Sequence, residues 1–252
     1  MRTKIQFFIL LIVCFQCTNE EVKKKELLFA ENSFDDLIKT RIDFKLYSDS
    51  TYIFSLEEKD VNHEKNEIFK GRYITKNDSI LFSPFHFDFV KAEKAVIKNN
   101  FIEFLGGRYP LKIKIQKSSI VQNIDFDTLK FSNYALFTYD SNFYNCFSGH
   151  VRPSDLNNDE LVKIDSILNL CFIQNKERIS RKADAYFKQC IAVINSDNEK
   201  EVWIHCLCKD GMAHQYHQYQ IVVVHDGGDC FLSFKINLST LKYYDLHING
   251  LA

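Results

Sequence analysis

Short alternations of apolar and polar residues, separated by turn residues, fill residues 42–117 and restrict that stretch to β structure. The clearest of them is YPLKIKIQK, in which Leu111, Ile113 and Ile115 alternate with lysines. Strict alternation predicts a strand with one face toward a core and the other face outward. Several short strands at this spacing predict an up-and-down antiparallel sheet, closed or nearly closed into a small barrel.

The order LYSDSTYIFSL…GRYITKNDSILFSPF resembles the small lipocalin-like domains found in bacterial lipoproteins. The resemblance covers roughly a third of the chain and implies a lipocalin-like β domain over residues 32–122. A barrel of this kind could hold a small apolar ligand. The alternative is that its inward aromatic side chains fill the interior, and alternation assigns four of them there: Tyr52, Phe54, Phe82 and Phe104.

The second half of the chain opens with a complete helix-start pattern. Asn157 can cap a helix, and Glu160 follows three residues later, as in a capping box. The helix is expected to end near Gln174. Its apolar residues share one face: Leu161, Ile164, Leu168 and Cys171.

Five strands are expected after this helix, at residues 186–194, 200–208, 219–225, 230–238 and 243–249. The two glycines of DGGD, residues 226–229, predict a hairpin between the third strand and the fourth. One helix packed on an antiparallel meander is an α+β layer, here over residues 130–252. It resembles cystatin-like folds. The closing segment also resembles uncharacterised domains of secreted bacterial proteins, a family that implies no activity.

The N-terminus has the pattern of a secretory signal. Arg2 and Lys4 precede an apolar run at residues 7–13, which is shorter than the roughly 20 residues that a spanning helix needs. The run closes on CFQC and the chain then becomes polar, which resembles the signal of bacterial lipoproteins. The resemblance implies a signal peptide over residues 1–17 and lipid attachment at Cys17.

The residues before Cys17 depart from the lipoprotein pattern, because Phe15 and Gln16 stand where small residues are usual. Plain secretion is therefore the alternative, and an uncleaved membrane helix is a further one. Residues 18–31 are expected to form a charged tether. The protein is thus placed in the bacterial cell envelope, periplasmic or surface-exposed, with the membrane as a partner through an N-terminal lipid.

Export decides how the cysteines are interpreted. In an oxidising compartment an even set favours disulfides, although the sequence does not specify their connectivity. Alternation also places Cys230 on the same side of the sheet as Cys206 and Cys208, so these thiols are expected to be clamps or core residues. The six disulfide candidates are Cys146, Cys171, Cys190, Cys206, Cys208 and Cys230.

The expected function is binding or structural, with a small apolar ligand or a protein as partner and no cofactor. A metal-binding protein is the alternative, with Cys206, Cys208, His214 and His217 as ligands, although their spacing does not match the usual zinc templates. An unrecognised hydrolase is the second alternative. Catalysis is not favoured and no catalytic residue is assigned, because no known motif is present. A formal net charge of -1 gives no basic field for nucleic acid.

Overall fold

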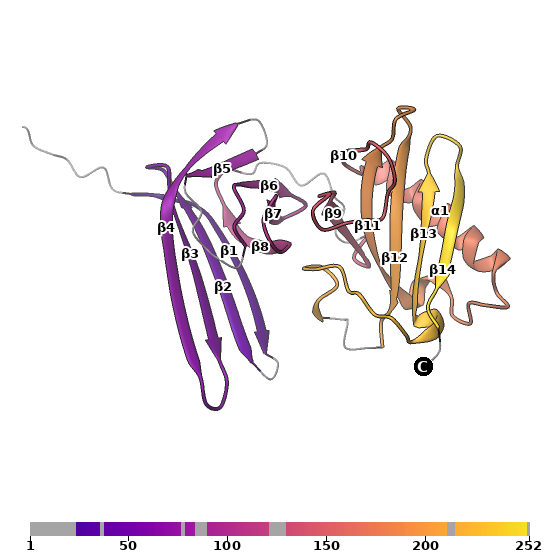
Figure 1. The fold of residues 1–252 in the computed structure, drawn as a ribbon, viewed down its shortest axis with the longest axis horizontal. Helices are drawn as coiled ribbons and strands as arrows, with labels where there is room; N and C mark the ends of the chain where they lie inside the picture. The colour runs from indigo at the N-terminus through magenta and orange to yellow at the C-terminus, as the bar shows by residue number, and fades with distance from the viewer. Residues whose placement is uncertain are drawn as a thin grey trace, which may run out of the picture.

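The protein is described by a computed structural model at residues 24–35, 38–76, 79–83, 90–120, 130–210 and 215–250. The expected signal peptide, Cys17 and His214 lie outside these residues. An eight-stranded closed barrel is followed by a six-stranded sheet that carries one helix of the described chain (Figure 1). The fold class expected from sequence, mainly β with a barrel followed by an α+β layer, is confirmed.

The barrel strands pair antiparallel in sequence order, and the first strand closes the barrel on the eighth. Alternating buried and partly exposed residues run along most of these strands, because one face of each lines the barrel core. The strands are β1 (Glu26–Asp35), β2 (Lys39–Tyr47), β3 (Thr51–Lys59), β4 (Glu64–Lys76), β5 (Ser79–Ser83), β6 (Lys94–Lys98), β7 (Phe101–Leu105) and β8 (Leu111–Ser118).

The expected tether over residues 18–31 is wrong for its last six positions, since β1 begins at Glu26. Leu28 and Ala30 are fully buried in the barrel core, and β1 supplies the partner that β8 needs for closure. The β domain therefore starts before residue 32. Acidic and lysine residues surround this strand in the sequence and obscure its alternation of apolar and polar residues. That alternation has a structural role once β1 pairs with β2 and β8.

The barrel interior is filled by aromatic rings. All four side chains expected to point inward are buried, and Phe44 joins them. The ring centroids of Phe44 and Phe104 lie 5.3 Å apart, and those of Tyr52 and Phe82 lie 5.2 Å apart. These are contact distances for aromatic pairs, which supports the filled interior over an apolar ligand cavity. Gly71 of the Gly-Arg-Tyr step faces Tyr52, and a Cβ there would lie 2.6 Å from the tyrosine ring.

The second sheet has the order β10-β11-β12-β13-β14, with β9 also paired to β11. Helix α1 (Asn158–Gln174) packs on one face, as the view in Figure 1 shows. The expected capping box is present: Asn157 and Glu160 each accept a backbone hydrogen bond from the other. The strands are β9 (Tyr134–Thr138), β10 (Arg152–Ser154), β11 (Tyr186–Ile194), β12 (Lys200–Cys208), β13 (Phe231–Asn237) and β14 (Lys242–Ile248). In the described part of the chain no helix is long and apolar enough to span a bilayer.

The sheet is mixed rather than a pure antiparallel meander. Strand β9 pairs parallel to β11, with Leu136 opposite Cys190, and neither β9 nor β10 was expected from sequence. Every residue of β9 is buried, because both faces of the strand are covered. A strand of only five residues that is buried on both faces shows no alternation, so periodicity gives little by which to detect it.

The strand expected at residues 219–225 is wrong. Strand β12 pairs directly with β13, so no place remains between them for another strand. The segment is a loop on the sheet face opposite α1, and side chains satisfy its backbone. Gln189 Nε2 donates to the carbonyls of His217, at 2.7 Å, and Gln220, at 2.6 Å, while Gln189 Oε1 accepts from Val222 N at 3.0 Å. The expected hairpin at residues 226–229 is instead a left-handed Gly227 followed by a short 3-10 turn.

Candidate functional site

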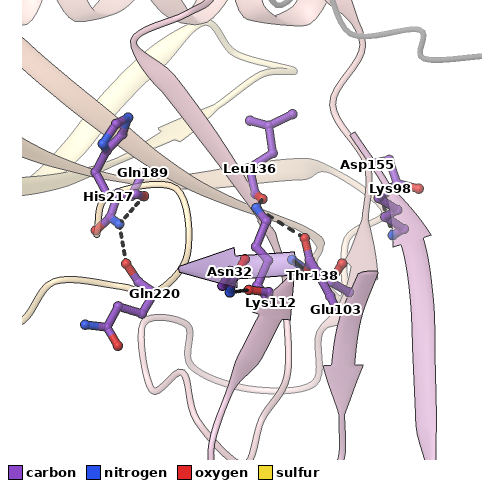
Figure 2. A network of polar contacts seen from close by, with 10 residues as sticks. All are labelled: Asn32, Lys98, Glu103, Lys112, Leu136, Thr138, Asp155, Gln189, His217 and Gln220. Carbon is purple, nitrogen blue, oxygen red and sulfur yellow. Dashed lines mark hydrogen bonds and ion pairs between the residues drawn. The ribbon is translucent and has the colours of Figure 1, made fainter. Parts of the chain in front are cut away.

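The barrel meets the second sheet at the open edge of β9. Lys112 of β8 donates from Nζ to the carbonyl of Leu136, and Thr138 N donates to Glu103 Oε2 of β7 at 2.8 Å. Lys112 Nζ also lies 3.4 Å from Glu103 Oε1. Figure 2 shows these two side chains reaching from the barrel strands to the backbone of β9. Two charged side chains thus bond to backbone groups that would otherwise pair with a neighbouring strand at this edge.

This pair is removed from water. Lys112 is 4% exposed and Glu103 is 5% exposed. Burial lowers the pKa of the Lys112 ammonium, and the Glu103 carboxylate opposes that shift. The ammonium also lies over the rings of Phe101, at 4.4 Å, and Phe137, at 4.2 Å, one from each half of the protein. A buried pair with all these partners fixes the two halves in one relative position.

Aromatic contacts support the same junction from the loop after β12. The ring of Phe34 in β1 lies 5.3 Å from that of Tyr216 and 5.2 Å from that of Tyr219. Phe101 also contacts Tyr219, at 5.8 Å between centroids. The segment that was expected to be a strand is therefore part of the contact between barrel and sheet.

An open cleft of about 550 Å³ lies along this junction. The barrel contributes Glu93 and Lys94, and the second half contributes Tyr139, Asp140 and His150 to its lining. Asp140 also holds the junction, because its Oδ2 accepts a hydrogen bond of 2.7 Å from the backbone of Gly106. The cleft therefore presents carboxylates, basic groups and an aromatic ring to a solute, on walls that belong to both halves.

Of the three cysteines expected on one side of the sheet, Cys208 and Cys230 form a disulfide. Their Cα atoms lie 4.9 Å apart, within the range that a disulfide spans. The other four disulfide candidates are free thiols in this structure: Cys146, Cys171, Cys190 and Cys206.

Three of these thiols are at most 1% exposed: Cys171, Cys190 and Cys206. Cys171 belongs to α1, while Cys190 and Cys206 lie in the apolar cluster between helix and sheet. Burial raises the pKa of Cys171 to about 11 and that of Cys206 to about 12. Thiolates, which bind metals and attack disulfides, are therefore disfavoured here.

The structure does not bring together the three metal-ligand candidates that it describes. Cys206 faces α1, and Cys208 is bonded to Cys230 in the disulfide. His217 lies against the other face of the sheet, with its ring stacked 3.8 Å from that of Phe187. His214 lies outside the described residues, and among those described no group of three potential ligands is close enough to hold an ion.

His205 is a buried histidine, so its protonation should change the free energy of unfolding. Its Nε2 lies 2.9 Å from the carbonyl of Val222, and its ring stacks on Trp203. Burial lowers the pKa of His205 to about 4. The unfolded chain therefore binds a proton below pH about 6.5 that the folded chain does not bind, so stability falls as pH falls from 6.5 toward 4.

We expect acidification from about pH 7 to about pH 5 to cost about 2 kcal/mol through His205 alone. His205→Gln keeps a nitrogen that can donate to Val222 and does not titrate, so its stability should fall less over that range. Urea unfolding of both proteins at the two pH values measures the difference. Equal losses in the two proteins would contradict the assignment.

The junction residues were not identified from sequence. Glu103 in FIEFL and Lys112 in YPLKIKIQK stand on the outward face of their strands, where charge is ordinary. Their burial depends on what covers the barrel from outside. Only the position of β9 converts these exposed-face charges into a buried pair.

No protein-family model matches this chain, and no curated protein or solved structure is significantly similar to it. The arrangement of its side chains is therefore the basis for a functional proposal.

Proposed function

We propose that this protein is an exported, lipid-anchored protein of the bacterial cell envelope that binds a small polar molecule in the cleft between its two halves. The observation that carries the binding part is the cleft itself, whose walls come from both halves of a junction held by a buried ion pair. Ligand sites occur preferentially at such domain interfaces. Because the two halves are already joined without a ligand, less conformational entropy is lost when a ligand binds.

The residues that line the cleft suit a ligand that carries both a positive and a negative group. Lys94 and His150 can face an anionic group, while Glu93 and Asp140 can face a cationic one. Tyr139 offers an aromatic wall between them. Amino acids and short peptides have this combination of groups. The aromatic filling of the barrel favours this cleft over the barrel interior as the binding site.

A panel of amino acids and dipeptides tests the cleft by thermal unfolding. A ligand at about a hundred times its dissociation constant stabilises the folded state by about 2.7 kcal/mol, which raises the midpoint by several degrees. Lys94→Glu should abolish the shift. Lys242→Glu is the matched control, because Lys242 lines a separate hollow on the β13–β14 side. If no compound raises the unfolding midpoint, or if both variants show the same shift as the wild type, the cleft is not the binding site.

Lipid attachment is tested separately, through Cys17. The Cys17→Ser variant has no thiol to acylate, so it should leave the membrane fraction and appear as soluble or unprocessed protein. Membrane fractionation, together with mass spectrometry of the mature N-terminus, measures this. Retention of the variant in the membrane with its N-terminal segment intact would support an uncleaved helix and contradict the lipid anchor.

A further inference from the structure

A second, smaller pocket of about 260 Å³ lies between the start of β9, helix α1 and the start of β11, away from the interdomain cleft. Its most unusual lining residue is Lys188. This lysine is only 3% exposed and belongs to β11, on the side of the sheet that faces α1. Lysine is almost never buried to this extent unless it is paired.

Lys188 differs in this respect from Lys112. In the part of the chain that the structure describes, no carboxylate lies within 4.0 Å of the Lys188 Nζ. Its direct cross-strand neighbours are Tyr134 on β9 and Cys206 on β12. The ammonium lies 5.3 Å from the ring centroid of Tyr134, and the thiol of Cys206 is fully buried. These direct neighbours offer the ammonium ion no anionic partner, and the two carboxylates that line the pocket, Asp165 and Asp184, lie more than 4.0 Å from it.

The surroundings of this amine therefore shift its protonation equilibrium toward the neutral form. Burial is the main cause that lowers the pKa of Lys188, and Lys209 lowers it further. The nearby Cys206 and Asp165 act in the opposite direction without reversing the shift. A desolvated lysine that loses its proton becomes a nucleophilic amine, which is how lysines that form Schiff bases are activated.

The opposite wall of the pocket is polar and already ordered. The Tyr134 hydroxyl donates to Asp165 Oδ1 at 2.7 Å. Asn169 Nδ2 donates to the other oxygen of the same carboxylate at 3.3 Å. A hydroxyl and a carboxylate at this wall can hydrogen-bond a small molecule whose reactive carbon approaches the amine.

We propose that this pocket takes a small aldehyde or ketone, which forms a reversible imine with the Nζ of Lys188. The amine nitrogen forms a bond to the carbonyl carbon, and the carbonyl π electrons move to its oxygen, giving a carbinolamine after proton transfer. The nitrogen then loses its proton as the hydroxyl leaves with one, so the products are the imine and one water. No oxidant or reductant is consumed. The site is independent of the interdomain cleft and of the function proposed for it.

Trapping with propanal and cyanoborohydride tests the proposal on the purified full-length protein. The reductant converts the imine to a stable propyl-lysine, which peptide mass spectrometry locates. At neutral pH we expect Lys188 to be labelled severalfold faster than exposed Lys242, because a lowered pKa enlarges the fraction of neutral, nucleophilic amine. Labelling of Lys188 at the rate of Lys242, or more slowly, would overturn the proposal.

A variant separates entry through the pocket from general reactivity. Asn169 is exposed at the rim, so Asn169→Trp should narrow the opening without altering the core. Labelling at Lys188 should fall severalfold in this variant, while labelling at Lys242 stays unchanged. Unchanged labelling at Lys188 would mean that the aldehyde does not arrive through this pocket, and would also overturn the proposal. Neither result depends on ligand binding in the interdomain cleft.

Discussion

Lys112→Met is expected to lower the free energy of unfolding by about 3–5 kcal/mol, a large part of the 5–15 kcal/mol that typically stabilises a folded protein. The substitution leaves the Glu103 carboxylate buried without its cationic partner. It also removes the hydrogen bond to the carbonyl of Leu136, at the edge of β9. An unpaired buried charge costs more than the pair contributes, because its desolvation is no longer compensated.

A second substitution separates charge from shape. In the double variant Lys112→Met with Glu103→Gln, the amide oxygen can still accept from Thr138 N and no buried charge remains. We therefore expect the double variant to recover part of the lost stability. Lys117→Met is the matched control, since this lysine is exposed on the same strand, and it should change stability by no more than about 0.5 kcal/mol. Denaturant unfolding measures all three, and a loss below about 1 kcal/mol for Lys112→Met would contradict a stabilising role of the ion pair at this junction.

Loss of the Cys208–Cys230 disulfide is expected to cost about 3 kcal/mol. The two residues are 22 apart in sequence, and their bond restricts this loop in the unfolded chain. It also joins the end of β12 to the residue that precedes β13, around the loop that carries Tyr216 and Tyr219 to the barrel. The disulfide therefore limits the freedom of a segment that contributes to the junction.

Thermal unfolding of Cys208→Ser under oxidising conditions measures this loss. Reduction of the wild type should reproduce most of it, and should have no further effect on the variant. Cys146→Ser is the control, because Cys146 is a partly exposed free thiol, and its midpoint should stay near that of the wild type. If the wild type unfolds at the same temperature with and without reductant, the bond does not stabilise the fold as expected.

Local patterns predicted several elements at the positions that they occupy. Strands β11 and β12 were expected at the residues where they occur, and the capping box of Asn157 and Glu160 was expected from residue spacing alone. The inward aromatics of the barrel followed from alternation in the same way. Such patterns are readable because side chains repeat every two residues in a strand and about every 3.6 in a helix, whatever lies beyond them.

Elements that depend on distant partners were missed. β9 is short and buried on both faces, so it has no alternation to detect. β1 lies among charged residues in the sequence, and its role as a strand depends on pairing with β8. Residues 219–225 have the composition of a strand, yet β13 occupies the only free edge of β12. In each case the competition for a neighbouring strand decided the outcome, and that competition is not encoded in a short window of sequence.

By itself, then, the sequence determined which residues of the predicted barrel strands and of the helix point to a core, because that depends on local periodicity. The tertiary structure alone decided what covers the other faces. Lys112 stands on the outward side of its barrel strand and becomes buried only because β9 lies against it. Lys188 becomes a buried amine beside a pocket only because α1 and β9 close over that part of β11. Burial of a charge is a property of the whole arrangement, since it depends on removing water from every side of the group.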